Sequence, residues 1–137
     1  MAIYAEKDYP PIPDVRRIGV IGAGQMGAGI AQVAAVSGFD VKLMDVAADQ
    51  LDAAVTRIGR LLDRQVNKEA MTGAERDEAI GRIDRGTSME GFADCDLVIE
   101  AATENEELKH KIFNQLVPHL KPDALIASNT SSISITR

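Results

Sequence analysis

Residues 16–31 of this chain read RRIGVIGAGQMGAGIA. The β-branched residues at its start predict a short strand, the glycines predict a tight turn, and the small residues that follow predict a helix. Three of the glycines have the spacing G-x-G-x-x-G within this strand–turn–helix context. The context favours a phosphate-binding turn over the alternative, a glycine-rich turn without a ligand.

Each of these three glycines has a separate physical role in such a turn. Gly22 lets the chain leave the strand sharply, Gly24 lacks a Cβ that would hold a pyrophosphate away from the backbone, and Gly27 lets the helix pack closely on the sheet. The free N–H groups at the start of the helix, with the positive end of its dipole, bind phosphate oxygens. We therefore expect a cofactor pyrophosphate to contact Gly22, Ala23, Gly24, Gln25, Met26 and Gly27.

A second strand is predicted over residues 41–44, directly before Asp45. Asp45 lies about 20 residues after the glycine turn, where a carboxylate accepts hydrogen bonds from an adenosine ribose and repels a 2′-phosphate. This spacing predicts NAD rather than NADP as the cofactor. The alternative is a solvated aspartate at a strand end.

Composition limits the classes of function. The 137 residues amount to about one domain, and the formal net charge of -6 without a basic run argues against nucleic acid or an anionic membrane as partner. A single cysteine, Cys95, excludes an internal disulfide and a cysteine metal cluster. No apolar run approaches ~20 residues and no signal peptide is apparent, so we expect a cytoplasmic, soluble protein. We also expect no metal site.

The order of elements predicts the fold class. Residues 1–15 have no sustained periodicity and predict an extended leader, whereas residues 16–137 form the domain. After the first unit we expect helices over 48–68 and 73–81, a short strand over 83–87, a turn of helix over 89–93, a strand over 96–100, a helix that Pro118 ends or bends, and a strand over 124–128. This alternation predicts an α/β fold with a doubly wound, mostly parallel, Rossmann-type sheet.

Ligands of such sheets bind outside the carboxyl ends of the strands. Four polar or glycine-containing loops fall on that edge, at residues 22–24, 45, 103–105 and 129–132. We therefore expect one binding edge.

Three stretches together resemble the 3-hydroxyacyl-CoA dehydrogenase family, and most closely its bacterial 3-hydroxybutyryl-CoA dehydrogenases. They are IGVIGAGQMGAGIA at 18–31, DLVIEAATENEELK at 96–109 and ASNTSS at 127–132. The resemblance covers nearly the whole chain from Arg16 onward. It implies the NAD-binding domain of an oxidoreductase of fatty acid metabolism, which transfers a hydride between NAD and a 3-hydroxyacyl-CoA or 3-ketoacyl-CoA.

The resemblance also implies roles for single residues. Glu104 and Lys109 resemble the pair near the nicotinamide end of NAD, and Ser131 resembles the serine that hydrogen-bonds the reacting 3-oxygen of the substrate. Lys68 approximately matches a lysine that contacts coenzyme A, although the serine that precedes it in the family has no counterpart here. The structural alternatives are a surface charge pair for Glu104 and Lys109, a loop serine that satisfies backbone groups for Ser131, and a solvated lysine for Lys68.

In this family a His–Glu dyad and a helical, dimerising domain follow the ASNTSS stretch, whereas the last residue here is Arg137. We expect both the dyad and this domain to be absent from this chain, and we expect His110 and His119 to be surface residues. The parent protein is expected to be a homodimer, and the chain alone to be nearly inactive. Two alternatives are an NAD-binding or assembly module without turnover, and another NAD-dependent hydroxyacid dehydrogenase.

Overall fold

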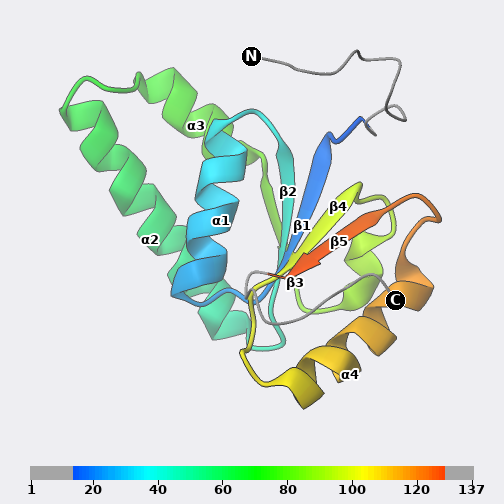
Figure 1. The fold of residues 1–137 in the computed structure, drawn as a ribbon. Helices are drawn as coiled ribbons and strands as arrows, with labels where there is room; N and C mark the ends of the chain where they lie inside the picture. The colour runs from blue at the N-terminus through cyan, green and yellow to red at the C-terminus, as the bar shows by residue number, and fades with distance from the viewer. Residues whose placement is uncertain (1–13, 129–137) are drawn as a thin grey trace, which may run out of the picture.

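Five parallel strands form one sheet in the computed structural model, which describes residues 14–128 (Figure 1). They are β1 (Arg17–Ile21), β2 (Asp40–Met44), β3 (Ile83–Gly86), β4 (Leu97–Glu100) and β5 (Leu125–Ser128), and their order in the sheet is β3-β2-β1-β4-β5. Every neighbouring pair is parallel. The predicted α/β Rossmann-type fold is confirmed, while most of the predicted leader and the loop with Ser131 lie outside the described residues.

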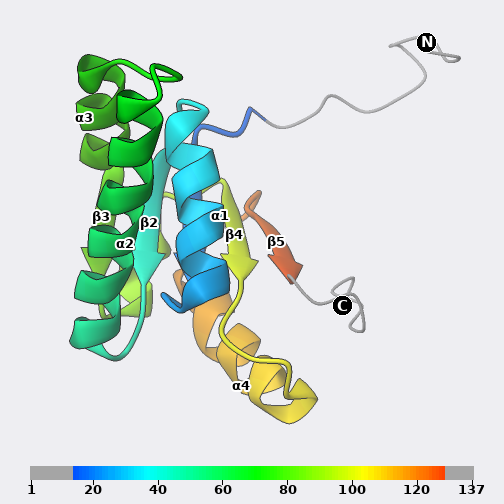
Figure 2. The ribbon, with the colours of Figure 1, turned by 90° about the vertical axis from the view of Figure 1, so that its left-hand side faces the viewer.

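Helices cover both faces of the sheet (Figures 1 and 2). One face carries α1 (Gln25–Val36), α2 (Ala48–Asn67) and α3 (Gly73–Gly81), and the other carries the short helix η2 (Met89–Phe92), α4 (Glu106–Leu116) and η3 (Val117–His119). Successive strand residues point to opposite faces, so Val20 packs in the core beneath α1 whereas Ile21 packs with Phe92 and Leu116. The two hydrophobic cores therefore hold the strands between two helical layers.

Local sequence signals account for the buried face of α2 and for the amino end of α3. The buried residues of α2 include Leu51, Ala54, Ile58 and Leu62, whose three- and four-residue spacing makes one apolar face. Thr72 caps α3 in a capping box with Glu75. No helix within residues 14–128 has the length and apolar character needed to cross a membrane.

Asp96 joins three segments at the amino ends of the central strands. Its carboxylate accepts hydrogen bonds from the backbone N–H groups of Arg16 and Arg17, at 2.8 and 2.9 Å, and pairs with the ammonium group of Lys121. The Lys121 ammonium and the two N–H groups hold the pKa of the Asp96 carboxyl well below its usual range. One charged side chain thus fixes the start of β1 and the turn before β5 against β4.

The strand order creates a crevice at the carboxyl ends of the strands, on the edge of the sheet opposite Asp96. The chain moves outward from β1 through α1 to β2 on one side, and later enters β4 on the other side of β1. Such a reversal of strand order separates the loops that follow the two central strands and leaves room for a ligand between them. The loops after β1 and β4 therefore border this crevice.

Candidate functional site

The turn after β1 requires glycine at Gly22. This residue has a φ of 103°, and a Cβ there would lie 2.8 Å from the Cα of Ala102 in the loop after β4. Its N–H donates to the carbonyl oxygen of Met44 at 2.7 Å. Only a residue without a side chain combines this conformation with such a close approach, so the predicted sharp turn is confirmed.

The other two glycines of the motif differ from each other. A Cβ on Gly27 would lie 1.6 Å from the carbonyl oxygen of Gly22, so the predicted close packing of the helix is confirmed. Gly24 has a φ of -71°, and no protein atom lies within 4 Å of the position of a Cβ. Neither backbone strain nor packing accounts for glycine at Gly24, and the missing side chain leaves room for a ligand to approach the backbone.

The amino end of α1 is open to an anion. Gly24 is the N-cap residue, no side chain caps the helix, and the first turn contains no acidic residue. The first N–H groups of a helix lack intrahelical partners and carry the positive end of the helix dipole. This end of α1 therefore fits a phosphate group.

Asp45 is held against the glycine turn. One of its carboxylate oxygens accepts a hydrogen bond from the N–H of Ala23 at 2.9 Å, and the other accepts one from the N–H of Ala47 at 2.9 Å. Strands β1 and β2 are adjacent, with Ile21 opposite Met44, so the two loops leave the sheet side by side. The structure thus brings the predicted ribose-binding carboxylate to the predicted phosphate-binding turn.

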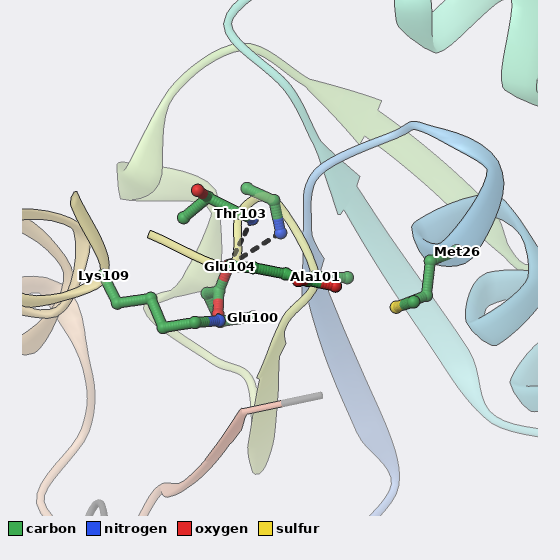
Figure 3. A pocket seen from close by; sticks show the side chains of 7 residues that line it. Met26, Glu100, Ala101, Thr103, Glu104 and Lys109 are labelled. Atoms are coloured by element: carbon green, nitrogen blue, oxygen red, sulfur yellow. Dashed lines mark hydrogen bonds and ion pairs between the residues drawn. The ribbon is translucent and has the colours of Figure 1, made fainter. Parts of the chain in front are cut away.

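A pocket lies between the start of α1 and the loop after β4 (Figure 3). Three residues singled out from the sequence line it, namely Met26, Glu104 and Lys109. In Figure 3 the Met26 side chain lies on one side of the pocket and that of Lys109 extends from α4 on the other. Met26 and Lys109, which are 83 positions apart in the chain, therefore line the same pocket.

Lys109 is buried, and its partner is not the one that the sequence suggests. Its ammonium group pairs with the carboxylate of Glu100 and donates to the hydroxyl of Ser128 at 3.1 Å. Glu104 is exposed, and within the part of the chain that the structure describes no ion pair joins it to Lys109. The alternative of a surface charge pair between the two is wrong, because α4 turns Lys109 inward.

Glu100 is a site residue that sequence reasoning missed. It is fully buried at the end of β4, where β5 places Ser128 beside it in register. The sequence signal is an acidic residue directly after a run of apolar residues, a pattern that equally marks the end of a strand.

The remaining predicted residues lie elsewhere. Lys68 is exposed and is the C-cap of α2, which has 20 residues and so extends about 30 Å from the carboxyl edge of the sheet toward the opposite edge (Figure 1). The structure therefore does not bring Lys68 to the pocket, and Ser131 lies outside the described residues. His110 and His119 are exposed, as predicted.

Neither a metal centre nor a reactive thiol is found in the described segment. Residues 14–128 contain no group of three or more histidine, cysteine or acidic residues that could hold a metal ion. Cys95 is buried, and burial together with the neighbouring Asp94 carboxylate raises the pKa of its thiol to about 11. A protonated, buried thiol is a weak nucleophile, so Cys95 has a packing role.

Comparisons with known proteins show the family to which this chain is similar. The model of the 3-hydroxyacyl-CoA dehydrogenase NAD binding domain matches residues 17–137. A 3-hydroxybutyryl-CoA dehydrogenase of Bradyrhizobium diazoefficiens is 54% identical over 123 residues, which are 90% of this chain and 42% of that protein. A probable 3-hydroxybutyryl-CoA dehydrogenase of Deinococcus radiodurans is 49% identical over 120 residues, 88% of this chain and 43% of the relative.

This chain is also similar in three dimensions to a solved structure. The (S)-3-hydroxybutyryl-CoA dehydrogenase PaaH1 of Ralstonia eutropha superposes with a TM-score of 0.85 at 44% identity, over 90% of this chain and 44% of that one. The present chain therefore spans less than half the length of these relatives.

Proposed function

Because this chain belongs to the 3-hydroxyacyl-CoA dehydrogenase family through its NAD-binding domain, we propose that it is the cofactor-binding part of an enzyme that interconverts 3-hydroxyacyl-CoA and 3-ketoacyl-CoA. The names of the relatives favour 3-hydroxybutyryl-CoA as the substrate. Since those relatives are more than twice as long as the part they share with this chain, the activity of the whole protein is a proposal about a longer molecule.

The division of labour within that molecule is part of the proposal. Residues 16–137 form the NAD-binding domain after a leader over residues 1–15, and residues outside this chain supply the general base and the helical dimerisation domain. The complete protein is then a cytoplasmic homodimer. Light scattering on the complete protein tests the dimer, because a monomer would contradict it.

One observation carries the assignment of the cofactor site: the open amino end of α1 at Gly24 lies beside a carboxylate, Asp45, that is tied to the same turn. The turn over residues 22–27 would hold the pyrophosphate through backbone N–H groups. Asp45 would accept hydrogen bonds from the adenosine ribose, and its negative charge would repel the 2′-phosphate of NADP.

Glu104, Lys109 and Ser131 would serve the nicotinamide end. Glu104 and Lys109 line the pocket beside the turn and offer a carboxylate and an ammonium group to ribose hydroxyls. When bound, NAD supplies the acceptor for the hydride that leaves C3 of the substrate. The Ser131 hydroxyl would accept a hydrogen bond from the 3-hydroxyl of the substrate or donate one to its 3-ketone. Contact between Lys68 and coenzyme A stays a prediction.

Calorimetric titration of this 137-residue chain with NADH, and in parallel with NADPH, tests the proposal. Saturable binding of NADH with weaker binding of NADPH is the expected result, because Asp45 disfavours the additional phosphate. Binding of neither nucleotide would contradict the proposed site. Oxidation of NADH by acetoacetyl-CoA, measured on the complete protein, then tests the reaction.

A further inference from the structure

Glu100 makes four polar contacts from a fully buried position. One carboxylate oxygen accepts hydrogen bonds from the backbone N–H groups of Ala102 and Thr103, at 2.7 and 3.0 Å. The other oxygen pairs with the ammonium group of Lys109 and accepts a hydrogen bond of 3.3 Å from the hydroxyl of Ser128. Both oxygens of the buried carboxylate are thus satisfied.

These contacts join three elements that meet at the pocket. The N–H donors belong to the loop after β4, the ammonium group to α4 and the hydroxyl to the end of β5. Figure 3 shows the Lys109 and Glu100 side chains pointing toward one another, with the loop folded over the carboxylate. A single carboxylate therefore sets the position of α4 relative to this loop.

The same contacts reach both residues proposed for the nicotinamide-end ribose. Glu104 directly follows Thr103, whose N–H is held by Glu100, and Lys109 is held through its ammonium group. Removal of one partner from a buried charge pair leaves the other charge uncompensated. Without the Glu100 carboxylate, Lys109 would lose its charged partner and the loop would lose two hydrogen bonds.

We propose that Glu100 is a positioning residue, which holds Glu104 and Lys109 in the arrangement that binds the nicotinamide-end ribose of NAD. The inference rests on the NAD site proposed above. Glu100 acts through Glu104 and Lys109, so it affects the binding of only the nicotinamide half of NAD. The pyrophosphate turn and Asp45 are held by separate hydrogen bonds, from Gly22 to Met44 and from Ala23 to Asp45.

The contributions of the two halves of NAD to binding can be measured separately, because fragments of the cofactor are available as ligands. ADP contains the adenosine and the pyrophosphate, whereas ADP-ribose adds the second ribose and NADH adds the nicotinamide as well. A residue that merely stabilises the fold affects the binding of all three ligands alike. A residue that positions the ribose contacts affects ADP-ribose and NADH and leaves ADP unchanged.

The test is calorimetric titration of the unmodified chain and of Glu100→Gln with ADP, ADP-ribose and NADH. The glutamine keeps the size of the side chain and removes its charge. Since a hydrogen bond to a charged group contributes more than a neutral one, we expect the affinity for ADP-ribose and NADH to fall about tenfold or more. The affinity for ADP stays within about twofold, because no hydrogen bond of the pyrophosphate turn is removed. Glu107→Gln is the matched control, since Glu107 is exposed on α4 and its change should leave all three affinities unaltered.

Equal losses for ADP and ADP-ribose in Glu100→Gln would overturn the inference, and so would no loss for either. If circular dichroism shows that Glu100→Gln does not fold, Ser128→Ala is tested instead, because it removes the hydroxyl that bonds both Glu100 and Lys109 and keeps the charge pair. That variant should weaken ADP-ribose several-fold without affecting ADP, and an unchanged affinity for ADP-ribose would overturn the inference. If the unmodified chain binds none of the three ligands, the proposed function fails as well, so the two failures are distinguishable.

Discussion

A carboxylate oxygen of Asp45 accepts a hydrogen bond of 2.9 Å from the backbone N–H of Ala23, across 22 residues of chain. This bond ties the end of β2 to the turn after β1, so the residue proposed to select the cofactor is fixed to the residues proposed to bind its phosphates. The consequences of this arrangement can be measured.

Asp45→Asn should narrow the preference for NADH over NADPH. The amide keeps the size of the side chain but removes the charge that repels a 2′-phosphate. We expect about a tenfold weaker affinity for NADH, because hydrogen bonds from the ribose to a charged acceptor are lost, with NADPH affinity unchanged or raised. Titration with both nucleotides measures the ratio, and Asp49→Asn, at an exposed residue of α2, is the control. An unaltered ratio in Asp45→Asn would show that Asp45 does not contact the ribose.

Gly24→Ala should fold normally and bind NADH poorly. The backbone at Gly24 suits alanine and the position of the new Cβ is empty, so only a bound ligand would meet it. Gly29→Ala is the control, because its Cβ also meets nothing and alanine in a helix interior is more stable by about 0.5–1 kcal/mol. Thermal unfolding and NADH titration of both variants separate stability from binding. Equal NADH affinities would contradict a phosphate at Gly24.

Gly27→Ala should instead destabilise the fold. Its Cβ would overlap the carbonyl oxygen of Gly22, so α1 must move away from the turn. Overpacking of this kind typically costs about 1–3 kcal/mol. Urea unfolding measures the loss in free energy of unfolding, provided that the m-value is unchanged. A midpoint equal to that of the unmodified chain would contradict the observed packing.

The Asp96 carboxylate should make the stability depend on acidic pH. Its pKa is lowered in the folded state, so its contribution is fully present above the usual pKa of an aspartate and is lost as the pH falls below that value. Asp96→Asn should lower the melting temperature at neutral pH and reduce its dependence on pH between about pH 5 and pH 2. Asp52→Asn, which breaks the exposed pair with Arg85, is the control and should change little. If the melting temperatures of Asp96→Asn and of the unmodified chain fall by the same amount over that pH range, the role of Asp96 is refuted.

The Cys95 thiol should not react while the protein is folded. Its pKa of about 11 and its burial leave almost no accessible thiolate at about pH 8. A chromogenic thiol reagent should therefore label Cys95 only after unfolding in urea. Rapid labelling of the native chain would mean that the segment around Cys95 opens.

Most of the fold could be predicted from the sequence because its signals are local. The apolar periodicity of α2, the capping residue Thr72 and the acid-bounded run before Glu100 each act within a few residues. The glycine turn is predictable for the same reason, since the φ of Gly22 restricts the residue type at that position.

The site could be predicted only in part. Its members Gly22, Asp45, Glu104 and Lys109 are recognised from type and spacing, but the partner of Lys109 is not. Glu104 and Lys109 are close in sequence, whereas α4 packs so that the ammonium group of Lys109 meets Glu100.

Periodicity and backbone sterics are properties of neighbouring residues, so the order of the elements, the glycine turn and the acid that follows β2 are predictable from the sequence. The folded structure was needed to show that β4 lies beside β1, that Ser128 lies opposite Glu100, and that Lys109 is buried against both. Strand neighbours and the partner of a buried charge are selected by packing between distant segments, where a charged side chain requires a satisfied environment that no local pattern specifies.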